Sequence, residues 1–337
     1  MPRSKTAVAA ALLTLMALVL PLAVAPVAAG DSAARIKAEH QRIVNYWTAE
    51  RIKNAKPRDF VRTPDGTFEP KAKPVKPPPG GGGRVTGASW TGGGTVVQRT
   101  GKVLFTMDGG NWVCSAAAVT DGRSDYSLIM TAGHCAYDEV NRAFATNWTY
   151  VPSFDTAPTF TCAQSTYGCW TTAGGGLVVH NGFATAGSFN TQATVHDFAI
   201  AIVPKGGKDG NTQLDSLGSY AIGYPAISTG GTVHAFGYPA AGKYHGNDLT
   251  YCTGPTFNDV YNGNQTWGIN CDMTGGSSGG PWIAAFTSTN PANPPTLTSL
   301  NSYGYNGLSN MYGPKFNSNT QAVWTRANSS SSNQLVP

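Results

Sequence analysis

The stretch TGGSSGGP, residues 274–281, is the most informative part of the chain. Its glycines allow the backbone to turn sharply and to approach a substrate carbonyl group closely. They also leave the backbone amides of Gly276 and Ser278 free to point at a developing oxyanion. A flexible Gly/Ser linker has a similar composition, but Cys271-Asp272 precede this stretch and Trp282-Ile283 follow it at once. The stretch therefore predicts a nucleophile loop.

Two earlier segments carry the side chains that a serine nucleophile needs. TAGHC, residues 131–135, follows an apolar run and contains His134. A nucleophilic serine requires a base with a pKa near neutrality within hydrogen-bond reach, and histidine is the usual one. In VHDFAIAIV, residues 195–203, Asp197 enters an apolar strand. A buried carboxylate there needs hydrogen bonds, often from a histidine ring whose tautomer it fixes.

The order of these residues along the chain excludes another class of serine hydrolase. Residues 276–280 also fit the G-x-S-x-G turn of α/β-hydrolases, but those enzymes need an acid and then a histidine after the serine. No Asp, Glu or His follows Asp272. A subtilisin-like order needs an Asp before His134, and the Asp residues that precede it lie in no subtilisin-like motif. Ser277 stays open as an alternative nucleophile, because it adjoins Ser278.

After residue 84 the chain has the texture of an all-β domain. Short apolar or alternating runs are separated by Gly, Asn, Asp and Pro, which favour turns. Four of these runs are predicted strands: 102–107, 127–131, 198–203 and 232–236. Six cysteines form an even set and predict disulfides. Because no C-x-x-C pair and no H-E-x-x-H occurs, neither a metal nor a cofactor is expected.

The first 84 residues differ from the rest in composition. Residues 1–29 combine a basic start, an apolar run and the small residues Val27-Ala28-Ala29, which predicts a cleaved export signal; a membrane anchor is the alternative. Residues 30–84 hold a short helical stretch over 31–58 and then a linker rich in Pro, Lys and Gly. They are predicted to be a propeptide, and a permanent N-terminal appendage is the alternative.

The charge of the chain follows the same division. Residues 1–84 hold 14 Lys and Arg against 6 Asp and Glu, whereas residues 85–337 hold 9 against 12. The basic charge therefore lies in the part that is expected to be removed, and the remaining domain argues against a nucleic-acid partner. We expect a secreted, extracellular protein that is a monomer and has no membrane partner once the signal is lost.

In this order, TAGHC, the DFAI strand and GSSGGP resemble the three signatures of chymotrypsin-like (trypsin-like) serine peptidases. The resemblance spans about residues 100–327. FGYP at 236–239 and CDMTGG at 271–276 are most similar to the bacterial glutamyl-endopeptidase branch. The resemblance implies that residues 85–337 form two six-stranded antiparallel β-barrels with the active site between them. It also implies a secreted serine endopeptidase, made as a zymogen, that hydrolyses proteins or peptides.

The same resemblance assigns the catalytic roles. Ser278 is the nucleophile because it stands directly before Gly-Gly-Pro, His134 takes its proton, and Asp197 orients the imidazole. The amides of Gly276 and Ser278 form the oxyanion hole. Two alternatives stay open, a catalytically silent homologue that binds peptides and an all-β sugar-binding module. An intact set of three residues weighs against the first alternative, and the aromatic residues that could bind sugars are more often core residues in a β domain.

The sequence identifies the residues of the specificity pocket less directly than the catalytic residues. Asp272 lies where trypsin-like members keep the carboxylate that binds Arg or Lys, but Thr274 replaces the family's Cys, so the alignment slips. Three further residues resemble the Ser-Trp-Gly strand that lines the substrate cleft: Ser302, Tyr303 and Gly304. Basic, acidic and other side chains before the scissile bond all remain open.

Maturation and disulfide pairing complete the expectations. Arg84-Val85-Thr86-Gly87 resembles an activation site and predicts cleavage after Arg84, although Ser277 stands where trypsin-like members carry the Asp that binds the new N-terminus. The family implies a bridge between Cys114 and Cys135. Proximity in sequence gives the other two pairs, Cys162 with Cys169 and Cys252 with Cys271.

Overall fold

The computed structural model describes residues 1, 29–63, 67–70, 86–154, 161–225 and 227–337. The predicted export signal and the predicted cleavage site after Arg84 therefore lie outside the described residues, apart from Met1 and Ala29 at the ends of the signal. Within the described ranges, no helix is long and apolar enough to cross a membrane.

The first half of the domain is built on a nine-stranded sheet with mainly antiparallel neighbours. Its main path runs through β11 (Trp170–Thr171), β10 (Thr146–Pro152), β5 (Thr100–Met107), β6 (Gly110–Val119), β7 (Ser127–Thr131), β13 (Ala199–Val203), β12 (Leu177–His180) and β23 (Gln334–Val336). β13 alternates Ala and Ile and is buried along its whole length. The helix α6 (Ser318–Asn328) packs on β12 and β13, so both faces of these strands are covered.

The second half consists of two six-stranded sheets. One contains β14 (Ala221–Ile222), β20 (Thr296–Leu300), β19 (Pro281–Ala284), β15 (Thr232–Gly237), β16 (Thr250–Pro255) and β4 (Ala88–Ser89). The other contains β17 (Phe257–Asn258), β18 (Thr266–Asn270), β22 (Asn310–Pro314), β21 (Tyr303–Tyr305), β2 (Phe60–Arg62) and β3 (Phe68–Pro70). β16 and β18 contact each other and join the two sheets.

The remaining elements are short or lie at the N-terminus. They are α1 (Ala29–Tyr46), α2 (Ala49–Asn54), α3 (Thr95–Arg99), α4 (Asn181–Ala184), α5 (Thr191–Val195), β1 (Lys56–Pro57), the pair β8 (Tyr137–Asp138) and β9 (Ala143–Phe144), and the 3-10 turns Gly133–Cys135, Leu214–Leu217 and Val260–Asn262. The hydroxyl of Thr48 caps α2 by accepting from the amide of Arg51.

The expected double β-barrel is confirmed, but its sheets hold more strands than two six-stranded barrels would. The additions come from the two ends of the chain. β1 pairs with β6, β2 and β3 join the sheet of β21, and β23 pairs in parallel with β12. The Ser/Asn-rich composition of residues 328–333 predicts a frayed tail, but the structure holds this tail in place. Asn333 accepts from the amides of Gly176 and Leu177, and β23 anchors the residues that follow.

Three disulfides close loops within the domain, and they have the expected pairings: Cys114–Cys135, Cys162–Cys169 and Cys252–Cys271. The first ties β6 to the turn that contains His134, and the third ties β16 to the segment that leads into the predicted nucleophile loop. The cysteines of these two bridges are 21 and 19 residues apart in sequence. A bridge that closes a loop of such a length stabilises a fold by about 3 kcal/mol.

The stacked pair His180 and His196 predicts a pH dependence of stability. The rings lie 4.5 Å apart, and burial together with the neighbouring His196 lowers the pKa of His180 to about 4. As the pH falls below 6.5, the ordinary pKa of histidine, His180 takes up a proton in the unfolded chain but not yet in the folded chain. The free energy of unfolding is therefore lost as the pH falls from 6.5 towards 4. His180→Asn keeps an acceptor for the amide of Gly182 and removes this titration.

Between pH 7 and pH 4.5, the melting temperature of the natural chain should fall by several degrees more than that of His180→Asn. Thermal melts of both chains across this range measure the difference, and parallel curves would contradict the assignment.

Candidate active site

His134 and Asp197 form a buried pair between β7 and β13. The Nδ1 atom of His134 lies 2.8 Å from Oδ2 of Asp197, and the backbone amide of His134 donates to Oδ1 at 2.8 Å. Both side chains are fully buried. β7 and β13 are antiparallel neighbours, with Ala199 opposite Thr131. This register brings the residues just outside the two strand ends together, as the sequence predicted for a carboxylate that fixes a histidine tautomer.

Ser278 lies beside this pair in the nucleophile loop. Its carbonyl oxygen accepts from the amide of Ser115 at 2.7 Å and lies 3.8 Å from Sγ of Cys135, the residue after His134. The hydroxyl of Ser115 donates to the carbonyl oxygen of Gly276 and accepts from the amide of Tyr238. One serine of the first barrel thus holds the nucleophile loop at two points.

Close approaches explain the glycines of this loop. Gly276 has φ +95°, and an added Cβ would lie 2.8 Å from the carbonyl oxygen of Tyr238. A Cβ on Gly279 would lie 2.3 Å from the carbonyl oxygen of Ser115. Larger residues would move the loop. Neither the amide of Gly276 nor that of Ser278, the two predicted oxyanion donors, has an acceptor among the described residues.

Ser302 connects the pair to the second barrel. Its hydroxyl donates to Oδ2 of Asp197, so this carboxylate accepts three hydrogen bonds. Sequence analysis had placed Ser302 in the substrate cleft, and its bond to Asp197 was missed because 105 residues separate the two. The preceding Asn301 fixes the strand by donating to the carbonyl oxygens of Phe236 and Ser277.

The other ring nitrogen of His134 faces the N-terminal segment. Nε2 lies 3.2 Å from the carbonyl oxygen of Arg58, and the part of the chain that the structure describes contains no hydrogen bond between His134 and the Ser278 hydroxyl. The carbonyl oxygen of Arg58 therefore occupies the ring nitrogen that would face a serine nucleophile. His134 is 0% and Ser278 2% exposed.

The predicted pocket residue Asp272 is already bound by three donors. Its carboxylate accepts from the amide of Gly87 at 2.8 Å, the hydroxyl of Tyr244 at 2.5 Å and Nζ of Lys243 at 2.7 Å. Burial alone would raise its pKa, but the hydrogen bonds outweigh burial and lower it. Asp272 therefore holds the start of the described domain near Gly87.

The remaining predicted substrate residues are placed as follows. The Thr274 hydroxyl exchanges hydrogen bonds with the backbone of Ala241. The Tyr303 hydroxyl donates to Asp259 in the interior, and its ring is buried. Gly304 lies on β21 opposite Val61 of the N-terminal segment.

Sequence analysis missed two residues that line the site. Glu139 lies five residues after His134 and is buried, and its carboxylate lies 3.4 Å from Nη2 of Arg58. Burial raises the pKa of Glu139, and Arg58 opposes this rise. The ring of Phe189 lies 5.5 Å from that of His134 at a steep angle. Neither residue stands in a motif, so no local signal could have found them.

The sulfur atoms near His134 offer no metal site. Cys114, His134 and Cys135 are close enough to hold an ion, but both sulfur atoms are bonded to each other. A disulfide sulfur lacks the thiolate charge that a metal requires.

A double β-barrel with a buried Asp–His pair beside a glycine-flanked serine defines a serine hydrolase architecture. Solved structures give the family. Serine protease AL20 from an extremophilic microorganism is 32% identical, covering 70% of this chain and 99% of its own, with a TM-score of 0.58. Protease Anisep from Arthrobacter nicotinovorans is 34% identical, covering 70% and 98%, with a TM-score of 0.56. A Glu endopeptidase in complex with MPD is 16% identical, covering 74% and 99%, with a TM-score of 0.52, and shares the fold.

The chain belongs to the chymotrypsin-like serine peptidases and is a serine endopeptidase. No protein-family model matches the chain, and no curated protein sequence matches it.

Loss of the Ser302 hydroxyl should slow catalysis. Ser302→Ala removes a hydrogen bond to a buried carboxylate, and such charge-assisted bonds contribute about 1.5–3 kcal/mol. We expect kcat to fall about tenfold with little change in KM, measured on a peptide substrate. Ser299→Ala is the matched control, since this buried serine on β20 bonds to the carbonyl oxygen of Pro314 instead. Equal losses in both variants would show that the effect is general destabilisation.

Proposed function

We propose that Ser278, His134 and Asp197 are the catalytic triad of a secreted endopeptidase that acts through an acyl-enzyme. The observation that carries this proposal is the buried pair of His134 and Asp197, with the backbone of Ser278 in contact with Cys135, the residue after His134. The intact set supports catalysis rather than a silent homologue.

In this mechanism, Oγ of Ser278 attacks the carbonyl carbon of the scissile peptide bond while Nε2 of His134 takes its proton. The carbonyl electron pair moves to oxygen, and the amides of Gly276 and Ser278 donate to that oxyanion. The intermediate collapses, the C–N bond breaks, and the leaving amine receives the proton from Nε2. Water then repeats the sequence on the acyl-enzyme, which releases the carboxylic acid and restores Ser278.

Asp197 keeps the His134 proton on Nδ1 and stabilises the imidazolium that forms. Because its oxygens also accept from the His134 amide and the Ser302 hydroxyl, the carboxylate has one orientation. His134 is thereby held ready to receive the serine proton on Nε2.

We further propose that residues 1–29 are an export signal, residues 30–84 a propeptide, and residues 85–337 the mature protease. The mature enzyme is a secreted monomer that requires no cofactor. Two observations support this division: Asp272 binds the backbone of Gly87, close to the proposed new N-terminus, and the neighbouring structures cover 70% of the chain.

Modification of Ser278 tests the triad. A fluorophosphonate probe should label the chain on one serine, and peptide mapping should find the adduct on Ser278. Ser278→Ala should lose the adduct, while Ser277→Ala should keep it, since the Ser277 hydroxyl already donates to the carbonyl oxygen of Thr274. An adduct on Ser277 would move the nucleophile by one residue.

Asp272 is proposed to anchor the N-terminal end of the mature domain rather than to bind a basic side chain. Asp272→Asn should therefore lower the melting temperature while leaving the residue preference before the scissile bond unchanged. A peptide-library cleavage profile of both chains measures that preference. A natural preference for Arg or Lys that vanishes in the variant would contradict this role.

A further inference from the structure

We propose that residues 56–62, KPRDFVR, are a built-in peptide inhibitor that binds across the active site in a non-productive geometry. The inference concerns the regulation of the proposed catalytic site and rests on the proposed function. The ligand of the cleft would be an extended strand that carries a guanidinium group and, two residues later, an aromatic ring.

The segment crosses from one barrel to the other directly over the site. β1 pairs in parallel with β6, with Pro57 opposite Val113. β2 pairs in parallel with β21, with Phe60 opposite Tyr303. Backbone pairing therefore holds both ends of the segment, one on each barrel, and the two residues Arg58 and Asp59 bridge the gap. Addition of a strand to an exposed edge is a common way in which a domain binds a peptide.

Arg58 occupies a site that suits a guanidinium group. Its Nε donates to the carbonyl oxygen of His134 at 2.8 Å, and its Nη2 lies 3.4 Å from the carboxylate of Glu139. The guanidinium carbon also lies 5.9 Å from the centre of the Trp112 ring. Glu139 is buried, and within the described chain Arg58 is its ion-pair partner. A buried carboxylate facing the cleft is costly without such a partner, so the site favours a cationic side chain.

Phe60 fills the neighbouring space against the catalytic histidine. Its ring stacks on Phe189 with centroids 4.1 Å apart and meets His134 edge-on at 5.3 Å. Phe68 of β3 adds an edge contact to Phe189 and extends the apolar cover. Stacked and edge-on aromatic pairs contribute about 0.5–1.5 kcal/mol each beyond their buried area.

The backbone geometry explains why the segment is not a substrate. Its carbonyl group at Arg58 lies against Nε2 of His134, the atom that must receive the Ser278 proton. The side chain of Asp59 lies against Gly275, where an added Cβ would be 2.8 Å from the Asp59 Cβ. The amides of Gly276 and Ser278 are not used by any carbonyl group of the described segment. The site thus holds a peptide whose carbonyl group blocks the base, and no carbonyl group of the described chain occupies the oxyanion donors.

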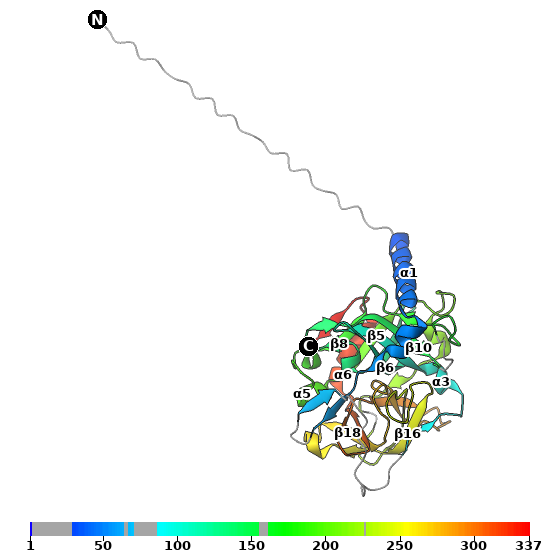
Figure 1. Cartoon of the computed structure of the whole chain (residues 1–337), viewed down its shortest axis with the longest axis vertical. Coiled ribbons are helices and arrows are strands. Elements are labelled where there is room, and N and C mark those ends of the chain that lie inside the picture. Colours follow the sequence, from blue (N-terminus) through cyan, green and yellow to red (C-terminus); the bar gives the residue numbers. More distant parts are fainter. Residues whose placement is uncertain (2–28, 64–66, 71–85, 155–160, 226) are drawn as a thin grey trace.

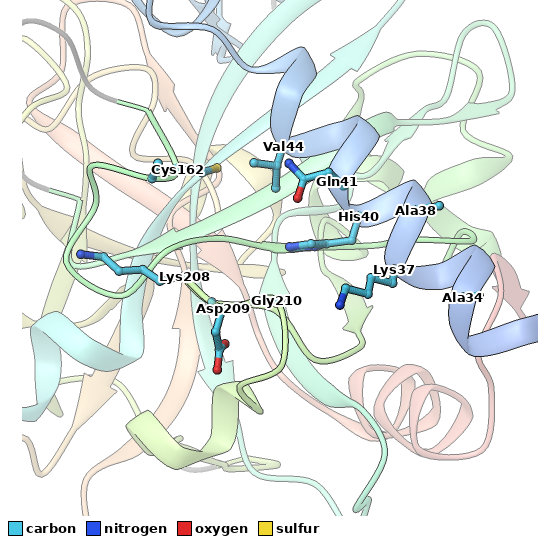
Figure 2. Close-up of a pocket in the computed structure, with 12 residues that line it drawn as sticks. Ala34, Lys37, Ala38, His40, Gln41, Val44, Cys162, Lys208, Asp209 and Gly210 are labelled. Carbon is cyan, nitrogen blue, oxygen red and sulfur yellow. The ribbon is translucent and has the colours of Figure 1, made fainter. Parts of the chain in front are cut away.

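The rest of the N-terminal region docks beside the site as a separate piece. α1 stands on the outside of the molecule with its first turns projecting away from it (Figure 1), and Trp47 at its end is buried and donates to the carbonyl oxygen of Asn147. A cavity of about 510 Å³ separates α1 from the loops at 162–163 and 207–210, with His40 and Lys37 facing it (Figure 2). Beyond this pocket, the helix contacts the domain through the buried residues Ile43 and Trp47 and through the His40 ring, which lies 2.9 Å from the Thr171 hydroxyl.

The distribution of charge also supports binding of the N-terminal region to the domain that follows it. The region up to residue 84 has an excess of basic residues, and the region after it has an excess of acidic residues. Arg58 with Glu139 is a direct contact of this kind. The Arg62 guanidinium adds a hydrogen bond to the carbonyl oxygen of Tyr261 on the second barrel.

The test measures the rate at which a fluorophosphonate labels Ser278 in the uncut chain, with intact mass confirming that the labelled species still carries residues 56–62. Arg58→Ala/Phe60→Ala should label about tenfold to a hundredfold faster than the natural chain. Lys53→Ala is the matched control, since Lys53 is exposed on α2, and it should label at the natural rate. A synthetic peptide of residues 55–63 should slow the double variant again, whereas the same peptide with both substitutions should not.

The outcomes separate this inference from the proposed function. Fast labelling of the natural chain, equal to that of the double variant, overturns the inhibitor and leaves the triad intact. Acceleration by Lys53→Ala, or a natural peptide with no effect on the double variant, also overturns it, because the segment would then act through general loosening. No labelling of any folded chain, with folding checked by a cooperative thermal melt, overturns the triad itself.

Discussion

The carboxylate of Asp197 is the point on which the arrangement of the two barrels depends. It is fully buried and accepts from the amide and ring of His134 in the first barrel and from the hydroxyl of Ser302 in the second. A buried carboxylate is tolerated only when its oxygens accept hydrogen bonds that replace those with water. The two barrels must therefore keep the relative position that maintains these bonds. The interaction that orients the histidine is therefore also an interaction that joins the halves of the domain. Asp197 thus serves both the fold and the site.

Much of the site could be predicted from the sequence because its chemistry is carried by short segments. His134 follows a strand, Asp197 precedes one, and Ser278 lies among glycines that close contacts with neighbouring backbone require. Strand pairing then brings the segments together without further information. The same is true of β7 and β13, whose apolar runs are local and uninterrupted.

The rest depended on contacts between residues far apart in the chain. The motif around Ser302 predicts a residue of the substrate cleft, because motif and spacing do not reveal which hydroxyl donates to a distant carboxylate. Asp272 has the sequence position of the carboxylate in the specificity pocket of trypsin-like members. In the structure, its oxygens instead accept from the amide of Gly87, 185 residues away, and from the side chains of Lys243 and Tyr244. The composition of residues 30–84 indicated a removable segment, but it contained no sign that Arg58 would lie against His134.

The C-terminal strand has a consequence for how the molecule is made. β23 pairs with β12, and α6 covers β12 and β13, so the first barrel is completed by the last twenty residues of the chain. During synthesis or export from the N-terminus, every strand of the second barrel emerges before this barrel can close. The strand that follows Asp197 therefore lacks its cover until residues 318–336 have been delivered, and a product truncated before them would have an unfinished first barrel.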